Sequence, residues 1–165
     1  MSLDEVSQTL WRERELLDLL LCKLEVEQLV LAAGRTRWLP AVTREVEYVL
    51  AEVKQVELVR AVLVAGVAAQ LGLEPEATLR ELAEAAPTPW DSILEQHRIA
   101  FLATADELRA VARLNRDLLS QGARAVQDAL AWLSENGDRP APDTYSAAGA
   151  SHAATLGARL VDGRL

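Results

Sequence analysis

NRDLLSQGARAVQDALAWL, residues Asn115–Leu133, shows most clearly how this chain folds. Apolar residues recur in it every three or four positions, which is the spacing of one face of an α-helix. Polar Asn115 and Gly122, which has no side chain, interrupt that face. The chain beyond residue 136 is rich in Gly, Pro, Ala and Ser and holds a single aromatic residue, Tyr145. An ordered helix followed by such a tail indicates binding to another protein rather than chemistry on a small molecule.

Two longer segments toward the N-terminus have the same helical periodicity. The first predicted helix runs from about Leu3 to Ala33 and is followed by Gly34, a good C-terminal stop. The second runs from about Thr36 to Leu71. Thr36 is expected to cap the second helix, and Pro40 falls in its first turn, where a missing N–H is tolerated.

The apolar stripes of these two helices are wide, and charged residues interrupt them. Glu13 and Glu27 are gaps in the first stripe, and Arg60 is the one charged break in the second. A stripe wider than the seam of a two-stranded coiled coil needs two neighbouring helices. The pattern therefore predicts a bundle.

A short helix and a long final helix complete the predicted elements. The short helix runs from Leu79 to Ala85, and Thr78 and Glu81 are spaced as a capping box before it. The final helix runs from Trp90, just after a Pro-Thr-Pro segment, to about Glu135.

We therefore predict an all-α fold: a long antiparallel three-helix bundle with a short connecting helix and a flexible C-terminal tail. Residues 1–135 are expected to form the helical domain, and residues 136–165 the tail. The chain is 50% hydrophobic but only 4% aromatic, so its core must be aliphatic, which is typical of helix bundles.

Charge and apolar run length limit the partners and the location. A net charge of -8 argues against nucleic acid and anionic membrane surfaces as partners. The longest apolar run, Ala61–Ala69, is far shorter than a membrane span, and the acidic start MSLDEVSQ is unlike a signal peptide. We expect a cytoplasmic protein that neither binds nucleic acid nor inserts into a membrane. The single cysteine, Cys22, is expected to be a small packed hydrophobe.

No residue pattern indicates catalysis. The two histidines, His97 and His152, lack the spacing of a zinc site, and no Glu-x-x-His pair of a di-iron bundle occurs. Phosphate-binding glycine loops are also missing from the sequence. We therefore predict no catalytic, metal-binding or cofactor-binding residues and no enzyme activity. His97 is expected at the surface or at the edge of the bundle.

Two further features leave alternatives open. The tryptophans Trp11, Trp38, Trp90 and Trp132 either close the ends of the bundle or contribute to a binding groove, for which Trp132 is the best candidate. Asn115 either fixes helix register or faces a wet edge, or its seam is exposed until an incoming helix covers it. Gly122 would then let that helix approach the backbone closely.

These segments resemble a known family. LWRERELLDLLLCKLEVEQLVLAAGRTRWL at Leu10–Leu39, the final-helix segment at Asn115–Leu133 and TYSAAG at Thr144–Gly149 are similar to FlgN-type flagellar export chaperones, and most to actinobacterial-style members. The family commonly shows an Asn followed by Leu-Leu in its last helix, here Leu118 and Leu119. It often has a Thr-Tyr element after that helix, here with Tyr145.

The resemblance implies a cytoplasmic chaperone that needs neither ATP nor metal. Its partners would be the C-terminal helices of the hook–filament junction proteins FlgK and FlgL, delivered to the flagellar type III secretion apparatus. The sequence does not decide whether the chaperone itself docks on that apparatus. The late helix and the C-terminal region would bind the client. The expected contact residues are Asn115, Leu118, Leu119, Gly122, Val126, Leu130, Trp132, Leu133 and Tyr145.

The sequence also allows a prediction of the oligomeric state and of what covers the binding groove in the free protein. We expect a monomer or weak homodimer, with the groove of the free protein covered by the tail, including Leu156 and Leu160, or by a second copy. The alternative function is a helical scaffold or adaptor without chaperone activity, which would form a defined larger assembly by itself.

Overall fold

The computed structural model describes residues 1–136, with side chains described up to residue 134. It contains two units, Met1–Arg124 and Ala125–Leu165. The expected tail from residue 137 onward, including Tyr145, Leu156 and Leu160, lies outside the described residues. The expected domain boundary at residue 135 therefore stays a prediction.

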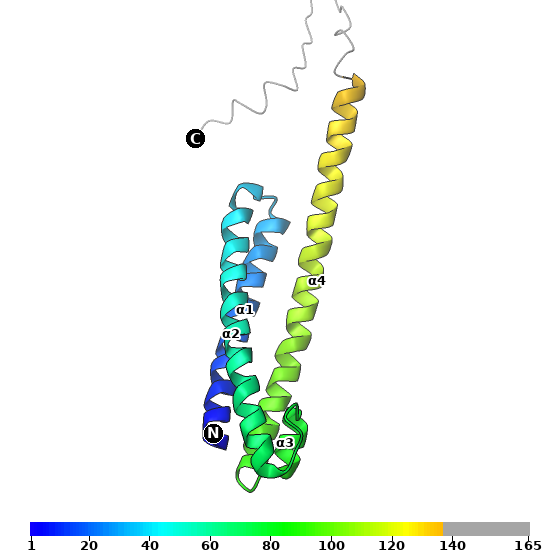
Figure 1. Ribbon diagram of the computed structural model, residues 1–165. Coiled ribbons are helices and arrows are strands. Elements are labelled where there is room, and N and C mark those ends of the chain that lie inside the picture. Colours follow the sequence, from blue (N-terminus) through cyan, green and yellow to red (C-terminus); the bar gives the residue numbers. More distant parts are fainter. Residues whose placement is uncertain (137–165) are drawn as a thin grey trace, which may run out of the picture. The chain divides into compact units, whose positions relative to one another are not determined.

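The described elements are all helical, which confirms the predicted fold class. Three long helices, α1 (Leu3–Ala32), α2 (Leu39–Leu71) and α4 (Trp90–Asn136), are joined by the short α3 (Leu79–Ala85) (Figure 1). A 3-10 turn, η1 (Thr36–Trp38), precedes α2. Within Met1–Arg124, α2 runs antiparallel both to α1 and to the first part of α4 (Figure 1).

Local signals fix most of the helix ends. The hydroxyl of Thr78 accepts a hydrogen bond from the backbone N–H of Glu81, whose carboxylate accepts one from the backbone N–H of Thr78, so the predicted capping box is confirmed. Gly72 ends α2 in the left-handed conformation, with φ of 73°, which residues with a Cβ rarely adopt. The prediction for Thr36 was wrong, because Thr36 begins the 3-10 turn and no side chain caps α2.

The core of the first unit consists of two aliphatic clusters. One joins the start of α1 and the end of α2 to α3 and α4 through residues such as Leu10, Val67, Leu82 and Leu94. The other lies further along the same helices and contains Leu16, Leu20, Val46, Val49 and Val53, with Leu108 of α4 packed against it. Because α3 contributes Leu82 and Ala83 to the first cluster, it forms part of that core.

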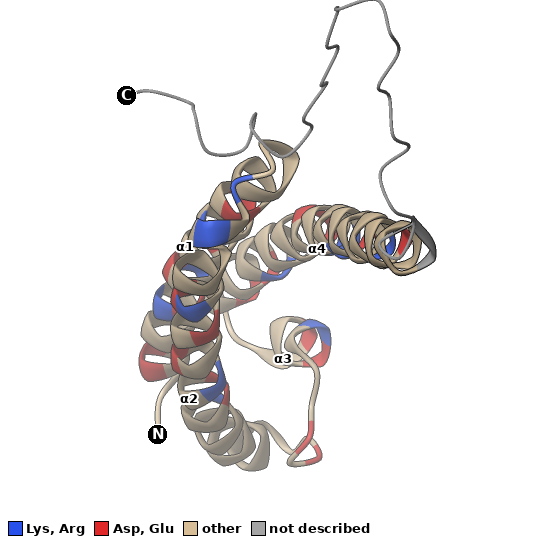
Figure 2. Ribbon diagram, turned by 90° about the horizontal axis from the view of Figure 1, so that it is seen from above, with Lys and Arg blue, Asp and Glu red and all other residues tan. Residues whose placement is uncertain are grey.

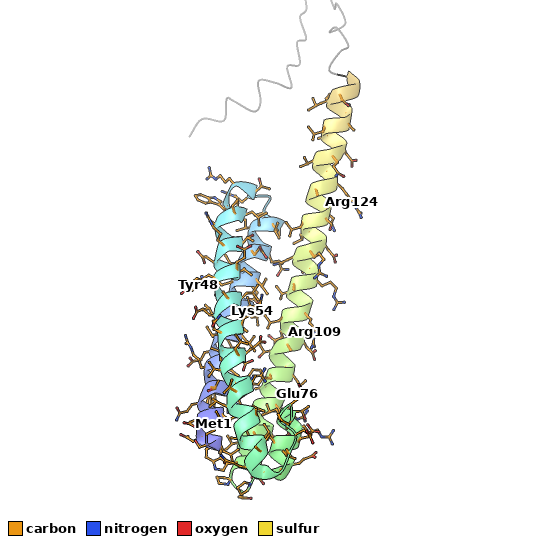
Figure 3. All side chains as sticks on the ribbon, viewed as in Figure 1. Met1, Tyr48, Lys54, Glu76, Arg109 and Arg124 are labelled. Carbon is orange, nitrogen blue, oxygen red and sulfur yellow. The ribbon has the colours of Figure 1, made fainter. Side chains whose placement is uncertain are left out.

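The outer surface carries both signs of charge along each long helix (Figure 2). Tyr48 on α2 and Arg109 and Arg124 on α4 project away from the ribbon into solvent (Figure 3). Cys22 is also exposed, so the prediction that it packs in the core was wrong. It lies two positions after buried Leu20, and two positions turn a helix by roughly 200°, away from the core.

Candidate functional site

Asn115 on α4 lies inside the bundle and joins it to α1. Its side chain is 3% exposed. Its amide Nδ2 donates to the backbone oxygen of Leu24 at 2.9 Å and to Oε2 of Glu27 at 3.0 Å. The other carboxylate oxygen of Glu27 accepts from the hydroxyl of Thr43 on α2 at 2.7 Å. The buried carboxylate therefore ties all three long helices together, in agreement with a role of Asn115 in helix register.

The α4 residues expected to bind a partner become exposed just after Asn115. Leu118 is half-buried, and every residue from 119 to 134 is exposed. Among them, Val126 is 60% and Leu130 61% exposed. Four large apolar residues recur on one side of this helical stretch at the spacing of helical turns: Leu119, Val126, Leu130 and Leu133. A row of this kind gains free energy when another apolar surface covers it.

Gly122 lies on the same helical stretch and faces open space. A Cβ atom built on it would meet no atom within 4 Å. Packing within the described residues therefore does not require a glycine here. Because a glycine inside a helix costs about 0.5–1 kcal/mol relative to alanine, its presence has no explanation in the packing of the described chain.

The four tryptophans occupy different surroundings. Trp132 is 60% exposed on the second unit. Trp38 follows the α1–α2 turn, beside the guanidinium of Arg37. Trp90 begins α4 and is half-buried. Trp11 lies within α1, with its ring against His97 and beneath the guanidinium of Arg14.

His97 is buried, and the prediction of a surface or edge position was wrong. Its side chain is 2% exposed, and its Nε2 lies 3.2 Å from the hydroxyl of Ser7. Its ring and that of Trp11 are nearly perpendicular, with ring centres 5.1 Å apart. Burial lowers the pKa of His97, and the nearby Arg14 lowers it further. Burial therefore favours the neutral imidazole over the charged one at this position.

Glu13 of α1 faces Arg60 of α2. The Oε2 atom of Glu13 lies 2.9 Å from Nε of Arg60, although the two groups are not aligned as a hydrogen bond. Burial raises the pKa of Glu13, Arg60 lowers it, and Glu57 raises it again. Both residues interrupt the apolar pattern of the sequence, but that signal by itself does not show that they pair.

The described part of the chain offers little support for other kinds of site. Among the described residues, no three His, Cys, Asp or Glu side chains are grouped so that they could hold a metal ion. Of the described helices, none is long and apolar enough to cross a membrane.

Comparison with known families identifies the chain. The model of the family described as FlgN protein matches residues 1–153. The chain belongs to the FlgN family. No curated protein and no solved structure matches it.

Membership of the FlgN family establishes the function. The chain is a flagellar export chaperone for the hook-associated proteins FlgK and FlgL. FlgN chaperones are cytoplasmic, and they are not enzymes. The predicted family, function and client proteins are thus confirmed, whereas the residues that contact the client are not tested by family membership.

Proposed function

We propose that this chaperone captures the amphipathic C-terminal helix of FlgK or FlgL on the exposed apolar row of α4. The observation that supports this most is the exposure of Leu119, Val126, Leu130 and Leu133 on one side of a single helix. A client helix that lays its apolar face on this row covers both surfaces, which is the usual mode of helix recognition in a groove. Trp132, and Tyr145 outside the described residues, would close over the client.

The free energy of this contact comes from apolar burial. Covering one Leu or Val side chain fully contributes about 1.5–3 kcal/mol. Four such residues exceed the cost of ordering a client segment, which is about 2–5 kcal/mol for coupled folding.

Two residues of α4 outside the row, Gly122 and Asn115, have special roles in this proposal. Gly122 lets the client backbone come close, because no side chain of the described residues fills the space beside it. Asn115 ends the part of α4 that is committed to α1 and α2, since its amide is already used by Leu24 and Glu27. The client would thus begin where the internal packing of α4 stops.

The test is isothermal titration of the full chain with the C-terminal segment of the FlgK homologue from the same organism. The wild-type protein should give a one-to-one complex with a large negative heat-capacity change, the mark of apolar burial. The double variant Leu119→Asp and Val126→Asp should lose binding while keeping its helicity. Unchanged affinity of this variant would exclude the α4 row.

The matched control adds the same two charges elsewhere on the helix. Gln121 and Ala131 lie about 140° around α4 from Val126, and both are exposed. The double variant Gln121→Asp and Ala131→Asp should bind the client as the wild type does. Loss of binding in both double variants would indicate a charge effect and contradict the proposed surface.

We propose that the free chaperone is a monomer or weak homodimer whose row is covered by its own tail or by a second copy. Sedimentation over a range of concentrations measures the oligomeric state. Hydrogen exchange of residues 136–165 tests whether the tail covers the row, because fast exchange throughout would eliminate covering by the tail. A stable higher oligomer would contradict this proposal.

We also infer that the chain belongs to an actinobacterial-like branch of the FlgN family. The support is the TYSAAG element at Thr144–Gly149 together with the N-terminal segment Leu10–Leu39. A phylogeny of family members that places the chain among another group of bacteria would contradict it.

A further inference from the structure

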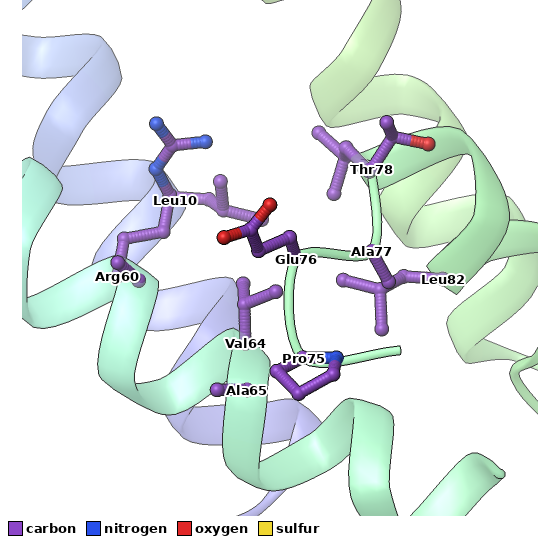
Figure 4. Close-up of a pocket in the computed structure, with 11 residues that line it drawn as sticks. Leu10, Arg60, Val64, Ala65, Pro75, Glu76, Ala77, Thr78 and Leu82 are labelled. Carbon is purple, nitrogen blue, oxygen red and sulfur yellow. The ribbon is translucent and has the colours of Figure 1, made fainter. Parts of the chain in front are cut away.

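Two hollows of the first unit differ in the charge of their lining. The hollow between α2 and the loop that leads to α3, of about 440 Å³, contains one cation, Arg60, and one anion, Glu76 (Figure 4). The second hollow, of about 580 Å³, lies in the groove between α1 and α2. Its lining contains two cations, Lys23 and Arg44, and one anion, Glu45. The groove thus has an excess of positive charge, on a chain whose net charge is -8.

Arg44 is the cation of this groove that no carboxylate neutralises. Nζ of Lys23 lies 2.6 Å from Oε2 of Glu45, and the hydrogen bond between them raises the pKa of Lys23. The charges of that pair therefore cancel. Arg44 is exposed and forms no ion pair with another described residue. An anionic group could approach Arg44 without displacing a carboxylate of the chain.

The turn between α1 and α2, next to this groove, is also basic. From Gln28 to Arg44 the sequence contains three arginines and no Asp or Glu. Two of them, Arg35 and Arg37, lie in the turn, are exposed, and form no ion pair with another described residue. Arg37 is four positions before Ala41, which lines the groove. Positive charge therefore extends from the groove to the turn.

The groove also exposes apolar side chains. Leu19 of α1, 42% exposed, and Tyr48 of α2, 70% exposed, both line it. Val26 is 41% exposed and lies roughly two helical turns after Leu19, on the same side of α1. Tyr48 projects on the side of α2 that faces away from α4 (Figure 3). Leu19, Val26 and Tyr48 thus form an apolar strip that the described helices leave accessible.

We propose that this groove binds an acidic amphipathic helix of a partner protein other than the client. The apolar face of that helix would lie on Leu19, Val26 and Tyr48. Its Asp or Glu residues would pair with Arg44 and with the arginines of the turn. Charge complementarity decides for an acidic helix, because Lys or Arg residues of a basic helix would lie against the unpaired Arg44.

This site is separate from the proposed client row. The lining of the groove comes from α1 and α2 alone, whereas the row belongs to α4. The proposal therefore does not depend on where the client binds, and a failure of either site leaves the other untested by that result and open to its own experiment.

The test uses the full chain with isotope-labelled Leu and Val methyl groups. The probe is an amphipathic helical peptide made only of Leu and Glu, and its counterpart of Leu and Lys is the charge control. The Leu-Glu peptide should give saturable shifts of the methyl signals of Leu19 and Val26, also with the FlgK segment in excess. The Leu-Lys peptide should leave these two signals unchanged. General charge attraction cannot produce this result, because the chain as a whole repels an acidic peptide.

Matched variants locate the binding in the groove. Arg44→Glu should weaken binding of the Leu-Glu peptide by roughly tenfold or more, because it places like charges together. Arg113→Glu, the same charge change at an exposed position of α4, should change it little. Leu19→Asp should also weaken binding, whereas Leu102→Asp, at a leucine of α4 that is 51% exposed, should not. Circular dichroism checks that all four variants keep their helices.

Two results would show that the groove is not the site. Shifts confined to Leu119, Val126 and Leu130 would mean that the peptide uses only the α4 row. Equal weakening by both members of either variant pair would mean that the peptide responds to the overall charge of the chain.

Two further results would assign the groove to another occupant and overturn the proposal. Shifts of the Leu19 and Val26 signals with phosphatidylglycerol vesicles, but not with the Leu-Glu peptide, would indicate a membrane surface. Shifts of the same signals on deletion of residues 137–165, without peptide, would indicate the chain's own tail.

Discussion

Leu94 and Leu130 are the same residue type on the same helix, yet they have opposite surroundings. Leu94 is 0% exposed, in a cluster with residues of α1, α2 and α3, whereas Leu130 is 61% exposed. Both belong to a helical apolar pattern that continues along α4. The comparison teaches that periodicity identifies an apolar face but not its partner. In one region the chain itself supplies the partner, and in the other we propose that a client does.

The largest expected effect sharpens this comparison directly. Leu94→Ala should lower the free energy of unfolding by about 2–5 kcal/mol, because it leaves a cavity in a closed core. Leu130→Ala should change it by less than about 0.5 kcal/mol, because the side chain is already in water. Urea denaturation of both variants measures the difference. Similar losses would mean that Leu130 is covered in the free protein.

The second effect concerns Asn115, which lies between the buried and the exposed parts of α4 and makes hydrogen bonds to α1. Asn115→Ala should cost about 1–3 kcal/mol, because Glu27 loses a hydrogen-bond donor while it stays buried. Gln121→Ala, at an exposed position on the same helix, is the control and should be close to neutral. Equal stability of the two variants would show that Asn115 does not hold α4 on α1.

The third effect is a dependence of folding stability on pH, and it arises from buried His97. Because burial lowers the pKa of His97, the unfolded state binds the proton more readily than the folded state. Stability should therefore fall as the pH drops below the ordinary value of 6.5, by at most about 1.4 kcal/mol per pH unit for one proton.

The matched variant for this pH dependence is His97→Gln, which can still hydrogen-bond Ser7 but cannot titrate. Comparing its unfolding with that of the wild type from pH 7 to pH 5 removes the contributions of Glu13 and other carboxylates. Parallel stability curves for the two proteins would show that His97 does not carry the effect.

The smallest effect is a gain in stability, and it concerns the exposed part of α4. Gly122→Ala should stabilise the free protein by about 0.5–1 kcal/mol, because the space beside it is empty and alanine favours the helix. The same variant should weaken the binding of the FlgK segment if the client backbone comes close to Gly122. Tighter or unchanged binding, measured by titration, would contradict that close approach.

Most of the secondary structure could be predicted because its causes are local. The capping box of Thr78 and Glu81 and the stop at Gly72 depend on residues a few positions apart. Thr36 misled the prediction, since a residue suited to cap a helix can equally begin a 3-10 turn. A short sequence segment does not distinguish these outcomes.

The interior polar contacts could not be predicted, because each joins residues far apart in the chain. The sequence marks Glu13 and Arg60 as breaks in two apolar stripes, but only packing brings them within 2.9 Å. In the same way, His97 next to Glu95 and Arg98 resembles a surface residue, whereas its helix turns it toward Ser7. Whether a side chain is exposed depends on which residues pack against it, and helical periodicity does not show which residues those are.

The sequence by itself determined the helices, their apolar faces and the membership of the FlgN family, because periodicity, capping and family motifs are all written along the chain. The tertiary structure decided which of these apolar faces are buried. It buried Asn115 against Glu27 and left Val126 and Leu130 in solvent. The physical reason is that burial requires a second surface, and only the fold shows where the chain provides one.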